Sequence, residues 1–130
     1  MRDAAVTLGG DFPDNWREPF ARLPERPGAS ARLEHVIAGG PEGDVRLGIV
    51  VTDGRLTDAK VGGDPEAPLT ITTTYADAQL LAAGELEASV AVMQGRAKVA
   101  GDVGSLLAVL PVTHTPEFRA ALASARSGTA

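Results

Sequence analysis

The segment VAVMQGRAKVAGDVGSLLAVL, Val90–Leu110, is the most strongly patterned stretch of the chain and decides its fold. An apolar helical run ends at Gly95, a short alternating run follows, and a second apolar helix begins behind Asp102. The segment holds no recognised nucleophile motif, metal-ligand set or phosphate-binding loop. Two apolar helices around a short strand either complete an ordinary core or cover a cavity, and the periodicity alone fits both.

Upstream of this segment the period changes from helical to alternating. Leu33, His35 and Ile37 alternate with Arg32, Glu34 and Val36, the period of two that is typical of a strand. Asp53-Gly54 is a type I′ hairpin signal between two further strands. The polar, proline-rich stretch that follows predicts a crossover. The predicted strands cover residues 31–39, 44–52, 55–62, 69–75 and 95–101.

Helical patterns flank these strands. Trp16, Phe20 and Leu23 have helical spacing, and Pro24 is expected to end that first helix. Thr74 followed by Asp77 is the pattern of a helix start, and this helix is expected to end near Gly84.

Two more helices follow the last strand. Behind the N-cap Asp102, an apolar stripe of Val103, Leu106, Leu107 and Leu110 predicts a helix that Pro111 ends. Thr115 then caps a helix with Pro116 at its first position. The stripe of that helix consists of Phe118, Ala121, Leu122 and Ala125.

The order of elements predicts a single α+β domain over residues 14–130, with helices covering one face of a five-stranded sheet. Residues 1–13, with Gly9-Gly10 and Pro13, are expected to form an irregular, mobile segment. A length of 130 residues is enough to bury a core without disulfides.

Composition narrows the classes of function. A net charge of −5 and the lack of a basic patch argue against nucleic-acid binding. The chain has no cysteine, which excludes disulfides and thiolate metal sites and fits a cytoplasmic protein. No apolar run is long enough to cross a membrane, and the first residues lack the apolar core of a signal peptide.

The search for catalytic motifs finds none, so the sequence predicts neither an enzyme nor a metal or cofactor site. His35 and His114 are the only histidines. His35 is interpreted as a half-buried side chain with its polar atoms satisfied, and His114 as a solvated loop residue. Acidic pairs such as Glu85 and Glu87 are interpreted as a solvated surface.

The stretch Met93-Gln94-Gly95-Arg96 through Gly101-Asp102 resembles the M-x-G-K-x-x-x-x-G-D/N segment of the sterol carrier protein 2 family. Upstream, residues 69–95 resemble that family's strand, helix, G-x-L-(D/E)-(P/A) turn and following helix. Two positions depart from the family pattern. Arg96 stands where lysine is usual, and Val92 stands where an aromatic residue is common.

The resemblance implies a largely antiparallel mixed sheet with a hydrophobic tunnel between sheet and helices. Such a tunnel accepts fatty acyl chains, acyl-CoA, sterols or other lipids, and the protein binds or transfers them without catalysis. The helix over Thr115–Arg126 would act as a lid, with Phe118 and Leu122 facing the tunnel. The residues expected to contact the ligand are Leu80, Leu81, Val90, Met93, Gln94, Leu106, Leu107, Leu110, Phe118 and Leu122.

Alternatives stay open at this point. The same fold occurs as a structural or dimerisation module beside an enzyme, with a collapsed cavity. Gln94 would either bind a ligand head group or cap the helix backbone. Homodimerisation and transient membrane contact are also left open. A cavity enzyme of the ketosteroid-isomerase type fits poorly, because such folds begin with long helices and end with the sheet.

Overall fold

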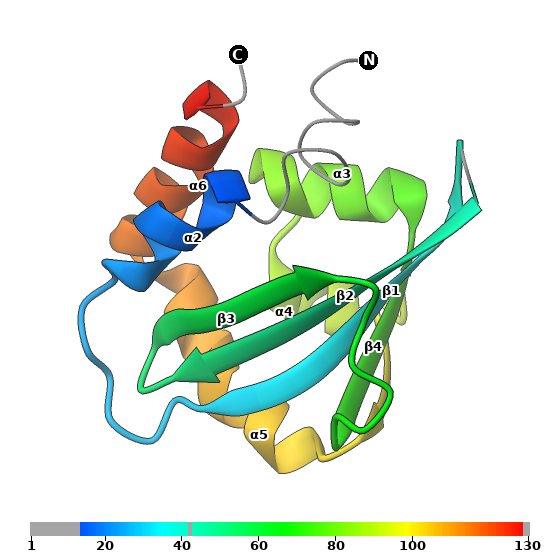
Figure 1. Ribbon diagram of the computed structural model, residues 1–130, viewed down its shortest axis with the longest axis horizontal. Coiled ribbons are helices and arrows are strands. Elements are labelled where there is room, and N and C mark those ends of the chain that lie inside the picture. Colours follow the sequence, from blue (N-terminus) through cyan, green and yellow to red (C-terminus); the bar gives the residue numbers. More distant parts are fainter. Residues whose placement is uncertain (1–13, 42, 129–130) are drawn as a thin grey trace.

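The computed structural model describes residues 14–41 and 43–128, and within them a five-stranded sheet lies against a layer of helices (Figure 1). The strand order is β3-β2-β1-β4-β5. Only β1 and β4 are parallel, and the other pairs are antiparallel. The predicted fold class is therefore confirmed, while the expectation for residues 1–13 lies outside the described residues. The strands are β1 Ala31–Gly40, β2 Gly43–Thr52, β3 Arg55–Val61, β4 Leu69–Thr74 and β5 Lys98–Gly101.

The meander β1-β2-β3 forms as predicted. Asp53 and Gly54 both have positive φ, 50° and 87°, as a type I′ turn requires. Because β3 lies at one edge and β4 beside β1, the crossover over residues 62–68 passes across one face of the sheet. Gly48 allows this close approach, since a Cβ there would lie 3.2 Å from both the Asp64 Cβ and the Gly63 carbonyl oxygen.

The helices begin at the predicted capping residues. The Thr74 hydroxyl accepts a hydrogen bond from the Asp77 N–H (3.1 Å), and the Thr115 hydroxyl accepts one from the Phe118 N–H (3.1 Å). Gly84, with φ 77°, ends α3 in the left-handed conformation. The helices are α2 Asp14–Ala21, α3 Tyr75–Ala83, α4 Ala88–Met93, α5 Val103–Val109, the 3₁₀ turn η1 Leu110–His114, and α6 Pro116–Gly128.

The apolar stripe predicted behind Asp102 is wrong in part. Helix α5 ends at Val109 after seven residues, and Pro111 lies inside the 3₁₀ turn that continues it. The side that packs on the sheet consists of Leu106, Val109 and Leu110. Val103 and Leu107 are 47% and 63% exposed and do not belong to the side that packs on the sheet.

The first helix is shorter than expected, ending at Ala21 instead of reaching Pro24. Proline disfavours helical geometry at the residue before it, which accounts for an earlier end. The α2–α6 pair forms an apolar cluster in which the Phe20 and Phe118 rings meet edge to face at 5.2 Å. Figure 1 shows these two helices side by side at one end of the sheet. Among the described helices, none is long and apolar enough to cross a membrane.

Candidate ligand-binding cavity

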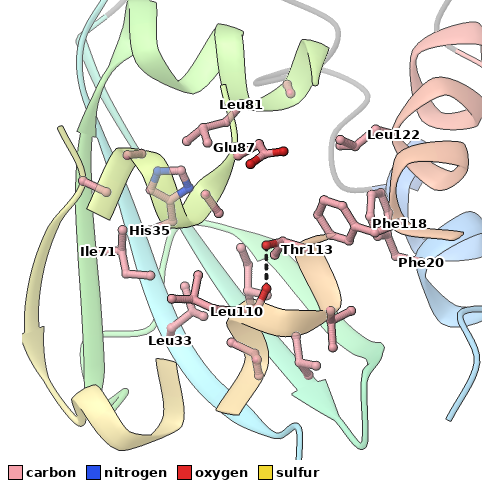
Figure 2. Close-up of a pocket in the computed structure, with 18 of the residues that line it drawn as sticks. Phe20, Leu33, His35, Ile71, Leu81, Glu87, Leu110, Thr113, Phe118 and Leu122 are labelled. Atoms are coloured by element: carbon pink, nitrogen blue, oxygen red, sulfur yellow. Dashed lines mark hydrogen bonds between the residues drawn. The ribbon is translucent and has the colours of Figure 1, made fainter. Parts of the chain in front are cut away.

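A cavity of about 310 Å³ lies between the sheet and the helices (Figure 2). Its wall is almost entirely hydrocarbon, drawn from four strands and from every described helical segment. The wall includes Phe20, Leu23, Leu33, His35, Ile37, Leu47, Ile49, Val51, Leu56, Ala59, Ile71, Thr73, Ala78, Leu81, Ala82, Leu86, Glu87, Ala88, Ala91, Val92, Ala97, Leu106, Val109, Leu110, Val112, Thr113, Phe118, Arg119 and Leu122.

The sheet wall follows from strand alternation. Leu33, His35 and Ile37 of β1 point to the helix side, because successive strand residues face opposite sides. Their register neighbours on β2 and β4, such as Ile49 and Ile71, share that face. The floor of the cavity is therefore a nearly continuous apolar surface.

The helix wall explains why space remains above that floor. Ala78 and Ala82 lie four residues apart on α3 and face the sheet. Ala91 of α4 also faces the sheet. All three are buried. A methyl group reaches only a short way toward the sheet, so these positions leave a gap that leucine would fill.

One polar pair interrupts the apolar wall. The His35 Nε2 lies 2.9 Å from the Thr73 Oγ1, within hydrogen-bonding distance. Burial disfavours the imidazolium and lowers the pKa of His35 to about 4. The ring that faces the cavity is therefore neutral near pH 7. The expectation of a half-buried histidine is confirmed, but only one of its two ring nitrogens, Nε2, has a hydrogen-bond partner among the described residues.

The cavity meets solvent where its wall becomes charged. Arg119 of α6 donates to Glu87, the residue before α4, with 2.8 Å between Nη2 and Oε1. The side chains of Arg119 and Glu87 are 63% and 43% exposed. The His114 Nδ1 lies 3.8 Å from the same carboxylate, and the His114 side chain is 44% exposed. The Thr113 hydroxyl, nearby, donates to the Leu110 carbonyl oxygen at 2.6 Å (Figure 2).

A family model described as the SCP-2 sterol transfer family matches residues 19–112. The chain belongs to this family. None of the curated proteins matches it in sequence.

Solved structures agree on the SCP-2 fold. A crystal structure of sterol carrier protein 2 superposes with a TM-score of 0.64 at 20% identity, covering 87% of this chain and 92% of that one. A sterol carrier protein 2 like 2 of Aedes aegypti gives 0.61 at 13% identity, covering 76% and 90%.

A double mutant of the sec-alkyl sulfatase PisA1 is also similar, with a TM-score of 0.58 at 25% identity. The match covers 85% of this chain but only 17% of the sulfatase. This chain is thus similar in fold to one part of a larger enzyme as well as to nearly the full length of sterol carrier proteins.

The structure brings together half of the residues expected to contact ligand in this SCP-2 domain. Figure 2 shows Leu81, Leu110, Phe118 and Leu122 converging on the cavity from three helical segments, and Leu106 also lines it. Phe118 and Leu122 belong to α6, the helix expected to form a lid. Contact of these residues with a ligand stays a prediction.

The other five expected residues lie outside the cavity wall. Leu80 and Val90 are half-buried and pack against Leu86 and Ala91, but their own side chains do not line the cavity. Met93 and Leu107 are 85% and 63% exposed and point to solvent. Both lie at positions that face away from the sheet, which an apolar pattern alone does not reveal.

Gln94 is exposed and takes part in a polar network instead of the cavity. Its Oε1 accepts from the Arg96 Nη1 at 3.3 Å, and the Arg96 Nη2 donates to the Asp77 Oδ1 at 2.7 Å. This hydrogen bond lowers the pKa of Asp77 and raises that of Arg96. Arg96, at the position where the family usually has lysine, thus ties the start of β5 to α3.

The sequence reading missed the small residues that create the space. Ala78 and Ala82, at helical spacing and followed by Ala91, were the available signal. It also missed the Glu87–Arg119 rim, because that contact joins residues 32 positions apart. Within the described residues, no three His, Cys, Asp or Glu side chains are grouped so as to hold a metal ion.

Proposed function

We propose that this protein binds a lipid or similar apolar molecule in the cavity and carries it between donor and acceptor without chemical change. The apolar cavity, with its hydrocarbon floor and its alanine-lined roof, carries the proposal. Membership of the SCP-2 sterol transfer family supports it. The sulfatase likeness brings no activity to this chain, because it covers a small part of that enzyme.

The size of the cavity suggests the size of the ligand. At about 30 Å³ for a group the size of a water molecule, 310 Å³ holds roughly ten methylene-sized groups. Burying ten methylenes gains about 8 kcal/mol before ordering is subtracted, which leaves binding in the micromolar range or weaker. An acyl chain of about ten carbons fits this volume, whereas a sterol is larger than the cavity.

The alternative is a structural or dimerisation module with a collapsed cavity. An open cavity of about 310 Å³ argues against this alternative. The proposal includes a cytoplasmic location, which fits the lack of cysteine. Brief contact with a membrane during ligand exchange and homodimer formation remain secondary parts of the proposal.

Native mass spectrometry of the protein, as purified and after incubation with fatty acids, acyl-CoA and sterols, tests the proposal. We expect a bound molecule in a one-to-one complex. Leu81→Trp, which places a large ring in the cavity, should abolish that complex. Leu80→Trp is the matched control, because Leu80 is the half-buried neighbour on α3 outside the cavity wall.

Loss of the complex in Leu81→Trp but not in Leu80→Trp supports binding in this cavity. A wild-type protein that stays free of ligand under all these conditions would overturn the proposal. Equal retention of ligand by both folded variants would also overturn it, because the ligand would then bind elsewhere.

A further inference from the structure

The His35–Thr73 pair is the least expected feature of the cavity wall. Thr73 is 2% exposed and His35 is half-buried, and both line the cavity. They come from neighbouring strands, β1 and β4, and both side chains face the helix side of the sheet. Figure 2 shows the imidazole with Leu81, Ile71 and Leu33 drawn around it. Polar atoms in such surroundings are stabilised only when they find partners.

The hydrogen bond between His35 and Thr73 leaves part of this capacity unused. A neutral imidazole has one N–H donor and one acceptor nitrogen, and a threonine hydroxyl can donate and accept. In either tautomer, their mutual bond uses one donor and one acceptor. One donor and at least one acceptor therefore remain, and the His35 Nδ1 has no partner among the described residues.

We propose that the His35–Thr73 pair is a polar anchor that selects ligands carrying a neutral hydroxyl or carbonyl oxygen at their buried end. This inference rests on the proposed function, since it assumes that the cavity takes up a ligand. A hydroxyl group can use both the remaining donor and the remaining acceptor. A carbonyl oxygen can use the donor.

The charges around the cavity exclude a buried carboxylate at this point. Among the described residues of the wall, Arg119 carries the one permanent positive charge. It lies at the solvent rim and is paired with Glu87. A carboxylate beside a neutral imidazole would be buried without a counter-charge, at a large energetic penalty. An acidic ligand would instead keep its carboxylate at the rim, away from the pair.

Three ten-carbon probes, chosen from the cavity volume, separate these cases: decanol, fluorodecane and decanoate. Their affinities are measured by displacement of anilinonaphthalene sulfonate from the wild type and from variants. His35→Phe keeps a planar ring but removes both nitrogens, and Thr73→Val keeps the volume but removes the hydroxyl. Thr72→Val is the matched control, because Thr72 lies next in β4 and faces the other side of the sheet.

We expect His35→Phe and Thr73→Val to weaken decanol binding about three- to tenfold, the usual effect of one net hydrogen bond. Neither variant should weaken the binding of fluorodecane or decanoate, and Thr72→Val should bind all three probes unchanged. Because a variant can fold poorly, a second measurement uses only the wild type. Decanol should shift the imidazole nitrogen resonances of His35, and fluorodecane should shift them much less.

The outcomes separate this inference from the proposed function. If decanol binds the wild type and both variants equally, or leaves the imidazole resonances unmoved, the anchor is wrong while ligand binding in the cavity stands. If none of the three probes binds the wild type, the proposed function fails and the anchor fails with it.

Discussion

The two faces of the sheet use the same strands for opposite purposes. On the helix side, Leu33 and His35 of β1 face a cavity. On the other side, Arg32 and Glu34 face the crossover over residues 62–68 through ion pairs and hydrogen bonds. Adjacent residues of one strand therefore contribute to a hollow apolar space and to a closed polar surface.

The polar face is held by directed contacts. Arg32 binds both oxygens of Asp64, with Nε–Oδ2 and Nη2–Oδ1 distances of 2.6 and 2.8 Å. The buried Glu34 accepts from the Arg46 Nη1 (3.1 Å) and from the Asp64 N–H (3.0 Å). These hydrogen bonds hold the crossover against the sheet in a fixed geometry. Apolar contacts on the helix side are non-directional and do not impose such a geometry. Directed polar contacts therefore occupy one face of the sheet, and the cavity lies on the other.

The largest expected effect is a loss of folding stability at mildly acidic pH, which originates at His35 on the helix side of the sheet. The pKa of His35 is lowered to about 4 when folded, against 6.5 in the unfolded chain. The unfolded state therefore binds the proton first as the pH falls, and stability is lost between pH 6.5 and about 4, by about 3 kcal/mol. Urea unfolding at a series of pH values measures this loss, and His35→Phe should remove it.

The polar face should respond only at lower pH. The hydrogen bond from Arg32 lowers the pKa of Asp64 below its usual 3.8. Its contribution is complete above that value and is lost as the pH falls below it. A stability curve of His35→Phe that still declines from pH 6.5 would show that the helix side is not the source of the upper transition.

A smaller effect is expected from Glu34→Gln. The amide NH₂ group would face one of the two donors that now point at the carboxylate, so one hydrogen bond is replaced by a clash of donors. We expect a loss of about 1–2 kcal/mol in the free energy of unfolding. Ligand affinity should not change, because Glu34 faces away from the cavity.

Glu85→Gln is the control for this variant, since Glu85 is exposed and distant from the crossover in sequence. Denaturant unfolding and probe displacement are measured on the same samples. A clear loss of ligand binding in Glu34→Gln at full folding would break the separation of the two faces.

Much of this division could be predicted from sequence, but not the cavity itself. Alternation placed Leu33, His35 and Ile37 on one side, and the turn and cap residues fixed the order of the elements. Whether the apolar side is filled depends on how far helix side chains reach, and here Ala78, Ala82 and Ala91 decide it. The rim pair and the His35–Thr73 pair join residues 32 and 38 positions apart, so no local pattern could indicate them.

The smallest effect is expected at Leu107, which the resemblance to the family assigns to the cavity wall. Its side chain is 63% exposed on α5, on the side away from the sheet. Leu107→Ser should therefore change stability by no more than about 0.5 kcal/mol and leave decanol affinity unaltered. Leu106→Ser, one residue earlier and buried at 4% exposure, should be destabilising by several-fold more in the same unfolding assay. A loss of decanol binding in folded Leu107→Ser would mean that α5 turns this side chain inward when the cavity fills. The helix side would then be adaptable as well as hollow, in sharper contrast to the fixed polar face.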